Sequence, residues 1–320
     1  MDLLLPLLQV VGGLAVLVAG GEFLVRGAVA SANALGVSPL IIGLTIVSFG
    51  TSAPEMVISV QAMLGGHPDI ALGNIIGSNI ANILLILGVA ALIFPISVDS
   101  KLLLREIPLL LLVSVLLFVF CYDGTVARYE AGFFLFLLFS YTFHIYRVSR
   151  KGQEGALTEE IEEETRLVMP GWKAALYILG GLALLVAGSD VLVNGAVTLA
   201  RSAGVSEAVI GLTILAIGSS APELITSVVA ALRKHADIAL GNVVGSNLFN
   251  ITCIGGVAAM VRPMEVAPRF LDADLPAMLG VTLVLAVFML TGRRVVRAEG
   301  AALLAGYIAY TAWLMMDAGA

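Results

Sequence analysis

Two short segments place a glutamate, a proline and several hydroxyl side chains within long apolar runs. The first is GTSAPE, from Gly50 to Glu55, and the second is GSSAPE, from Gly218 to Glu223. Because proline has no N–H group, each segment would interrupt a helix and leave a backbone carbonyl without its usual donor. A charge in mid-span costs about 2.5–3.5 kcal/mol on insertion scales, so the two glutamates indicate function. The side chains gathered at the breaks are Thr51, Ser52, Glu55, Ser219, Ser220 and Glu223.

A second polar pattern follows each glutamate along the chain. Its members are spaced by four residues, which keeps them near one face of a helix. They are Asn74, Ser78 and Asn82 in the first half, and Asn242, Ser246 and Asn250 in the second. Asn79 and Asn247 lie off these faces, and we expect them to serve helix packing.

Carboxylate, hydroxyl and amide oxygens are ligands for hard cations such as Ca²⁺ and Na⁺. Zinc, copper and iron would need His or Cys. The three histidines are dispersed along the chain, and Cys121 and Cys253 lie in or beside apolar runs. The pattern therefore predicts a site for transported cations, and we expect no cofactor and no enzymatic reaction.

The elements that carry these residues are membrane-spanning helices. Of the 320 residues, 59% are hydrophobic and only 12% are charged, with a mean hydropathy of +1.03. The apolar runs are long enough for helices and too long for barrel strands. We expect an all-α polytopic membrane protein with ten transmembrane helices, at 3–32, 38–64, 69–94, 102–121, 127–148, 171–202, 206–232, 237–261, 271–291 and 298–316.

The chain repeats itself at a fixed separation of 168 residues. Glu55 corresponds to Glu223 and Asn82 to Asn250, and the surrounding residues match as well. Each repeat holds five predicted helices, and an odd number makes the second repeat enter the membrane from the opposite side, as in many secondary transporters. The predicted parts are a first repeat at 1–148 with its motif at 43–83, a linker at 149–170, and a second repeat at 171–320 with its motif at 211–251.

The distribution of charge predicts the orientation. Most of the 17 Lys and Arg residues fall in connections on one side, which places both termini outside and the acidic linker in the cytoplasm. We expect a multi-pass protein of the cell (inner) membrane that contacts the lipid bilayer, with no nucleic-acid partner and no required protein partner. Asp69 and Asp237 are expected to cap helices. Glu22 and Arg26, four residues apart, are expected to pair.

GTSAPE with GNIIGSNIAN, and GSSAPE with GNVVGSNLFN, resemble the two α-repeats of the cation/Ca²⁺ exchanger superfamily, and most of all its prokaryotic Na⁺/Ca²⁺ exchangers. The resemblance covers nearly the whole chain. It implies four adjacent cation sites and a first and sixth helix that slide together. The ligands implied are Glu55, Glu223, Thr51, Ser219, Ser52, Ser220, Ser78, Ser246, Asn82 and Asn250, with the backbone carbonyls of Ser48 and Ala216.

Two departures from the family pattern bear on the coupling ion. Asn250 stands where several relatives carry Asp, which leaves two central carboxylates and disfavours the K⁺-dependent branch. Ser219 replaces the Thr of the first repeat. The expected activity is exchange of Na⁺ for Ca²⁺ by alternating access, electrogenic at about 3 Na⁺ per Ca²⁺. The alternatives are a Ca²⁺/H⁺ antiporter with the same carboxylates and, in another class, an intramembrane enzyme or a channel.

Overall fold

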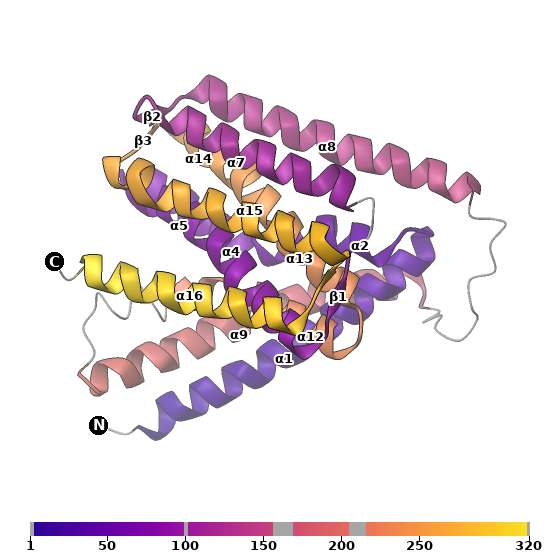
Figure 1. Ribbon diagram of the computed structural model, residues 1–320. Coiled ribbons are helices and arrows are strands. Elements are labelled where there is room, and N and C mark those ends of the chain that lie inside the picture. Colours follow the sequence, from indigo (N-terminus) through magenta and orange to yellow (C-terminus); the bar gives the residue numbers. More distant parts are fainter. Residues whose placement is uncertain (1–2, 99–101, 156–168, 205–215, 319–320) are drawn as a thin grey trace.

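The computed structural model describes residues 3–98, 102–155, 169–204 and 216–318. Within them the regular secondary structure is helical apart from two pairs of two-residue strands (Figure 1). The first half comprises α1 (Leu4–Leu35), α2 (Pro39–Ile42), η1 (Gly43–Val47), α3 (Ser48–Thr51), α4 (Ala53–Leu64), α5 (Pro68–Ala81), η2 (Asn82–Leu87), α6 (Gly88–Ile93), η3 (Leu102–Glu106), α7 (Ile107–Cys121) and α8 (Arg128–Gly155).

The second half follows the same order. Its helices are α9 (Gly171–Ser202), α11 (Ala216–Ser219), α12 (Ala221–Leu232), α13 (Ala236–Phe249), η7 (Asn250–Gly255), α14 (Gly256–Val261), η8 (Phe270–Asp274), α15 (Leu275–Gly292) and α16 (Arg297–Ala318). The segments labelled η are π-helical turns. The acidic stretch Thr158–Arg166 and the start of the predicted helix 206–232 lie outside the described residues.

Six of the described helices are long and apolar enough to cross a membrane, and the bent pair Pro39–Thr51 and Ala53–Leu64 would be a seventh. Helices α8, α11–α12 and α16 cover the other three predicted spans. α8 continues to Gly155, past residue 148, where the fifth predicted helix ends. No proline lies between Pro108 and Pro170.

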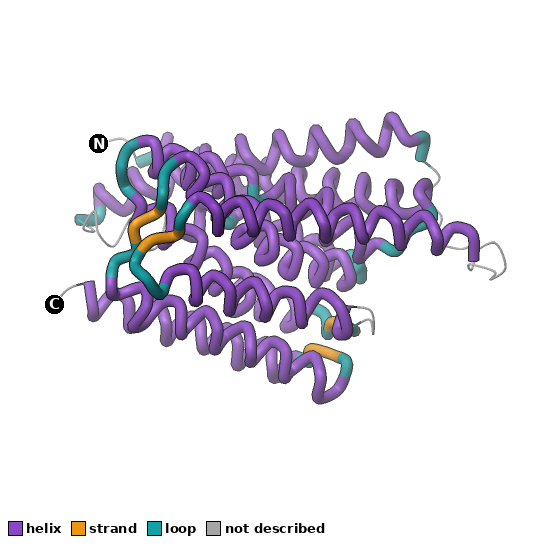
Figure 2. The backbone as a smooth tube through the Cα atoms, turned by 90° about the horizontal axis from the view of Figure 1, so that it is seen from above, coloured by secondary structure: helices purple, strands orange, loops and turns teal. Residues whose placement is uncertain are grey.

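The strands connect the two halves of the chain. β1 (Ile96–Ser97) pairs with β4 (Arg294–Val295), and β2 (Thr125–Val126) pairs with β3 (Met264–Glu265), both antiparallel. The two pairs lie toward opposite ends of the bundle (Figure 2). In both views α1 begins and α16 ends on the same side of the bundle.

Burial separates a central group of helices from a peripheral pair. In the apolar windows of Pro68–Ile93 and Ala236–Val261, 78% and 89% of the residues are buried, against 28% in α1 and in α9. These two peripheral helices lie antiparallel and pack extensively against each other. Glycines at heptad spacing line their contact, and backbone meets backbone there: Gly13, Gly20 and Gly27 of α1, and Gly181, Gly188 and Gly195 of α9.

Candidate cation-binding site

Both predicted helix breaks are present. Between α3 and α4 the backbone of Ser52 turns to φ −83° and ψ 9°, and the two helices meet at an angle of 44°. Ser220 has nearly the same conformation, φ −90° and ψ 11°, between α11 and α12. Pro54 and Pro222 follow in the first turn of the new helix, where a missing N–H has no consequence. The prolines therefore restart the helices at the glutamates.

The two glutamates are held by serines from the opposite half. Ser52 Oγ donates to Glu223 Oε1 at 3.0 Å, and Ser220 Oγ donates to Glu55 Oε1 at 3.2 Å. The glutamates are only 1% and 2% exposed. Among the described residues, the second oxygen of each carboxylate, Oε2, has no hydrogen-bond partner. Glu55, Glu223, Ser52 and Ser220 thus form one buried cluster across the two halves.

Other oxygens of the predicted set are also buried with no hydrogen-bond partner in the part of the chain that the structure describes: Asn82 Oδ1, Ser246 Oγ and Asn250 Oδ1. Asn79 Oδ1 and Thr226 Oγ1 share this state. A buried acceptor left unpaired is unfavourable, typically by about 1–3 kcal/mol. A cation among the oxygens of the predicted set would satisfy several acceptors at once, and oxygens of these types suit Ca²⁺ and Na⁺. This set of oxygen ligands therefore fits a cation that is the transported substrate.

Asn74 and Asn242, the first asparagines of the two polar helical faces, donate hydrogen bonds to the backbone of the glutamates. Asn74 Nδ2 donates to the carbonyl of Glu55 at 3.1 Å and to Ser59 Oγ at 2.9 Å. Asn242 Nδ2 makes the same contacts to the carbonyl of Glu223, at 3.3 Å, and to Ser227 Oγ, at 3.0 Å. Sequence analysis did not single out the two serines, although each lies four residues after its glutamate in both repeats.

Thr51 and Ser48 occupy the end of the broken helix. Thr51 Oγ1 donates to Asn242 Oδ1 at 3.2 Å and approaches the Ser48 carbonyl at 3.4 Å. The Ser48 hydroxyl donates to the carbonyl of Gly43 at 2.6 Å and lies 3.1 Å from that of Asn242. The side chain of Ser48 is therefore engaged in packing η1 and α3 against α13, and its backbone carbonyl remains its candidate ligand.

The remaining predicted residues are positioned only by the helices that carry them. Ser78 is buried on α5, and Ser219 is half-buried at the end of α11. Ala216 begins α11 directly after residues 205–215, which lie outside the described part of the chain.

Two smaller predictions meet different outcomes. Asp69 and Asp237 are not helix caps, because His67 and His235 occupy the N-cap positions of α5 and α13. The aspartates lie in the first turn, where a negative charge interacts favourably with the helix dipole. The predicted pair of Glu22 and Arg26 is confirmed.

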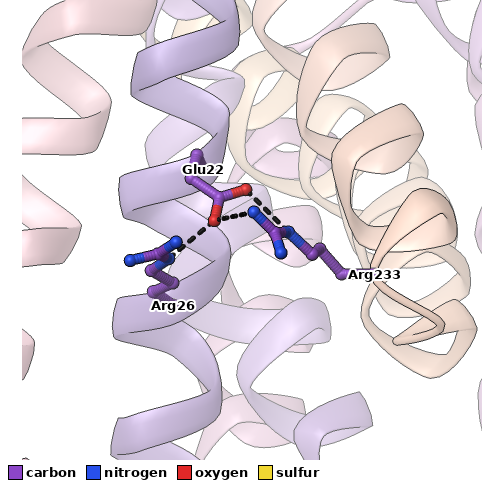
Figure 3. Close-up of polar contacts among 3 residues, drawn as sticks. All are labelled: Glu22, Arg26 and Arg233. Atoms are coloured by element: carbon purple, nitrogen blue, oxygen red, sulfur yellow. Dashed lines mark hydrogen bonds and ion pairs between the residues drawn. The ribbon is translucent and has the colours of Figure 1, made fainter.

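That pair has a third member. Arg26 Nε lies 2.6 Å from Glu22 Oε1, and Arg233 also binds Glu22 through Nε at 3.0 Å and Nη2 at 2.5 Å (Figure 3). Arg233 directly follows α12. Its contact therefore connects α1 to the helix that carries Glu223, which helical spacing could not predict.

A further pair of acidic residues at the repeat separation was not identified from the sequence. Glu106 and Asp274 are 168 residues apart, are 1% and 5% exposed, and each stands two residues before a proline. Arg105 pairs with Glu106, while Asp274 accepts a hydrogen bond from Tyr310 at 3.1 Å and lies 3.5 Å from Arg269. Their separation of 168 residues, which equals that of the two repeats, is the sequence feature that could have identified them. Because both acids have cationic neighbours, we assign them to the packing of α7 and α15.

A helical membrane protein with buried carboxylates, hydroxyls and amides gathered from two similar halves has the features of an ion transporter. A family model described as sodium/calcium exchanger protein matches residues 5–147 and 173–316. The chain belongs to the sodium/calcium exchanger family. It is a multi-pass membrane protein whose fold and family are those of cation/Ca²⁺ antiporters.

Relatives match along almost the whole chain. CaxA of Alkalimonas amylolytica is 41% identical over 313 residues, covering 96% of this chain and 98% of that protein. Inner membrane protein YrbG of Escherichia coli (strain K12) is 37% identical over 318 residues, covering 98% and 97%. Sodium/calcium exchanger MaX1 of Methanosarcina acetivorans is 34% identical over 332 residues, covering 93% and 95%.

The fold has a counterpart among solved structures. The sodium-calcium exchanger NCX_Mj, soaked with 10 mM Na⁺ and 10 mM Sr²⁺, superimposes with a TM-score of 0.82 at 31% identity. The match covers 97% of this chain and 98% of that one.

Proposed function

We propose that the protein is a secondary antiporter that exchanges Na⁺ for Ca²⁺ at one alternately exposed site. The observation that carries this is the pair of buried glutamates, each bound by a serine of the other half and each with one free carboxylate oxygen. Two carboxylates balance the charge of one Ca²⁺. The names of MaX1 and NCX_Mj support Na⁺ as the counter-ion.

We propose as ligands the residues that the sequence predicts. Glu55 and Glu223 would bind Ca²⁺ and share in Na⁺ binding, and the other ligands would complete the surrounding sites. These are Thr51, Ser219, Ser52, Ser220, Ser78, Ser246, Asn82 and Asn250, with the carbonyls of Ser48 and Ala216.

We further propose that residues 1–148 and 171–320 are inverted repeats of five spans each. Contacts that recur at the repeat separation support this, including those of Asn74 with Glu55 and of Asn242 with Glu223. The glycine-lined contact supports joint movement of α1 and α9, because interlocked backbones cannot easily slide past each other. Access would then alternate as this pair moves against the central helices.

A stoichiometry of three follows from assumed gradients. With about 10⁴ for Ca²⁺, about 10 for Na⁺ and about 100 mV inside negative, exporting Ca²⁺ costs about 10 kcal/mol. Two Na⁺ entering supply about 7.4 kcal/mol and three supply about 11 kcal/mol. Three Na⁺ suffice, and such exchange carries net charge. We place the protein in the inner membrane, in line with the name of YrbG, with both termini outside and residues 149–170 in the cytoplasm.

The test is ⁴⁵Ca²⁺ uptake into proteoliposomes driven by an outward Na⁺ gradient. Glu55→Gln and Glu223→Gln should each lower uptake about a hundredfold or more, because each removes a buried charge that the cation needs. Glu265→Gln is the control, since Glu265 is an exposed residue of β3. Undiminished uptake in both site variants would refute the site. Uptake driven only by a pH gradient in Na⁺-free buffer would favour H⁺ as the coupling ion.

A further inference from the structure

We propose that Asn247 is a positioning residue that turns the side-chain amide of Asn82 so that its oxygen, Oδ1, is presented to the transported cation. The inference rests on the proposed function, because it concerns one ligand of that site. It gives a role to an asparagine that lies off the polar face of its helix.

The orientation follows from a chain of three groups. The backbone carbonyl of Asn79 can only accept a hydrogen bond, and Asn247 Nδ2 lies 3.4 Å from it. The other end of that amide, Asn247 Oδ1, is therefore the atom that faces Asn82, at 2.9 Å from Asn82 Nδ2. Asn82 must donate there, since its partner is an acceptor. Its own oxygen is left pointing elsewhere.

Burial makes this orientation firm. The three asparagines are each at most 1% exposed, so bulk water does not compete for their amides. Turning Asn247 around would set its oxygen against the Asn79 carbonyl, and two buried acceptors would then face each other. Asn82 Oδ1 has no hydrogen-bond partner within the described ranges of the chain, which suits an oxygen that binds a cation. Asn82 also begins the π turn η2, and such turns are frequent at functional sites.

The second half lacks the equivalent contact. Position 79 corresponds to Asn247 and position 250 to Asn82. Asn79 Nδ2 donates to the carbonyl of Ile75 in its own helix, at 2.7 Å, and both Asn79 Oδ1 and Asn250 Oδ1 are buried without a partner. The side chain of Asn79 therefore orients nothing across the interface, which makes it a matched control for Asn247.

The first experiment compares Ca²⁺ affinity, measured as equilibrium ⁴⁵Ca²⁺ binding to the purified full-length protein. In Asn247→Leu the Kd should rise about tenfold, because Asn82 Nδ2 loses its acceptor and turns toward other oxygens. Asn79→Leu should change the Kd less than about twofold. Gel filtration and a thermal melt establish that each variant is folded, and Asn247→Ala replaces Asn247→Leu if the latter is not.

The second experiment separates orientation from packing. Asp at position 82 offers an oxygen whichever way it turns, so it needs no orienting partner. In an Asn82→Asp background, adding Asn247→Leu should therefore leave the Kd within about twofold. A packing role would instead produce the same tenfold loss in both backgrounds, and that result would overturn the inference. If the wild type itself bound no Ca²⁺, the proposed function would fail first.

Discussion

The breaks at Ser52 and Ser220 carry nearly the same residues, yet they contact α1 and α9 differently. Ser189 of α9 donates to the carbonyl of Gly218, which Pro222 leaves open, at 2.6 Å. The position equivalent to Ser189 in α1 is Gly21, which faces apolar atoms of Ile225 and Val229. At the first break, Gly50 faces the apolar side chain of Leu182 of α9.

The ion pair between Glu22 and Arg233 is also present in one repeat and not in the other. Glu22 of α1 binds Arg233, whereas its equivalent in α9 is Asp190 and the equivalent of Arg233 is Gly65. These two polar contacts of the α1–α9 pair therefore reach α11 and the residue that follows α12. Contacts shared by the repeats, such as those of Asn74 and Asn242, support the proposed cation site. If the pair moves as proposed, contacts present in one repeat only would favour one of its two arrangements over the other.

The largest expected effect comes from separating α1 from α9. A Cβ added at Gly181 would lie 2.6 Å from the backbone nitrogen of Leu24 and 2.8 Å from the carbonyl of Gly20. Gly181→Ala should therefore lower the free energy of unfolding by about 1–3 kcal/mol or more, measured as a fall in thermal melting temperature in detergent. Gly180→Ala, with open space around the new methyl group, should melt like the wild type. Equal melting of both variants would contradict the close backbone contact.

The next effect compares the two amides that hold the glutamates. Asn242 and Asn74 make matching donations, but Asn242 is fully buried, whereas Asn74 is half-buried. Asn242→Leu should therefore weaken Ca²⁺ uptake more than Asn74→Leu, with a KM higher by about a further fivefold, because water cannot replace the lost donor at the fully buried position. The measurement is the KM of Na⁺-driven uptake for each variant. A larger rise for Asn74→Leu would show that the first half dominates the site instead.

Much of the central site could be predicted from sequence because its features are local. Pro54 and Pro222 interrupt their helices whatever surrounds them, and a glutamate in an apolar run needs a partner. The four-residue spacing of Asn74, Ser78 and Asn82 places them near one helical face in any packing arrangement. The repeat then indicated which segments belong together.

The contacts that could not be predicted from the sequence depend on how helices from different halves are rotated against each other. Asn247 lies off the polar face of α13, and only its packing beside η2 brings it to Asn82. Arg233 reaches Glu22 across 211 positions of sequence. Neither the spacing of the charged residues nor the period of the apolar residues indicates which side chains meet between the two halves. The pairing of β1 with β4 and of β2 with β3 also joins segments far apart in the sequence.

The smallest effect tests whether the one-sided ion pair favours one arrangement of α1 and α9. Arg233 is 54% and Glu22 is 20% exposed, so the pair contributes about 1 kcal/mol at most. Under alternating access, Arg233→Gln should shift the balance between the two states by no more than about fivefold. The half-saturating Ca²⁺ concentrations measured from the two faces of the membrane should then move in opposite directions. High salt should reduce the difference between wild type and variant, because it screens an exposed pair.

Asp190→Asn is the matched control. Asp190 is the repeat equivalent of Glu22, but the repeat equivalent of Arg233 is Gly65, which has no charged side chain to pair with it. It should leave the sidedness of Ca²⁺ affinity unchanged. In Glu22→Arg combined with Arg233→Glu, the attraction is restored with its charges exchanged, although Arg26 would then repel the new arginine. Partial recovery of the wild-type sidedness is therefore expected. If Arg233→Gln and Asp190→Asn shifted the half-saturating Ca²⁺ concentrations equally, the contact between Glu22 and Arg233 would not be the cause. The total charge near α1 and α9 would then set the balance between the two states.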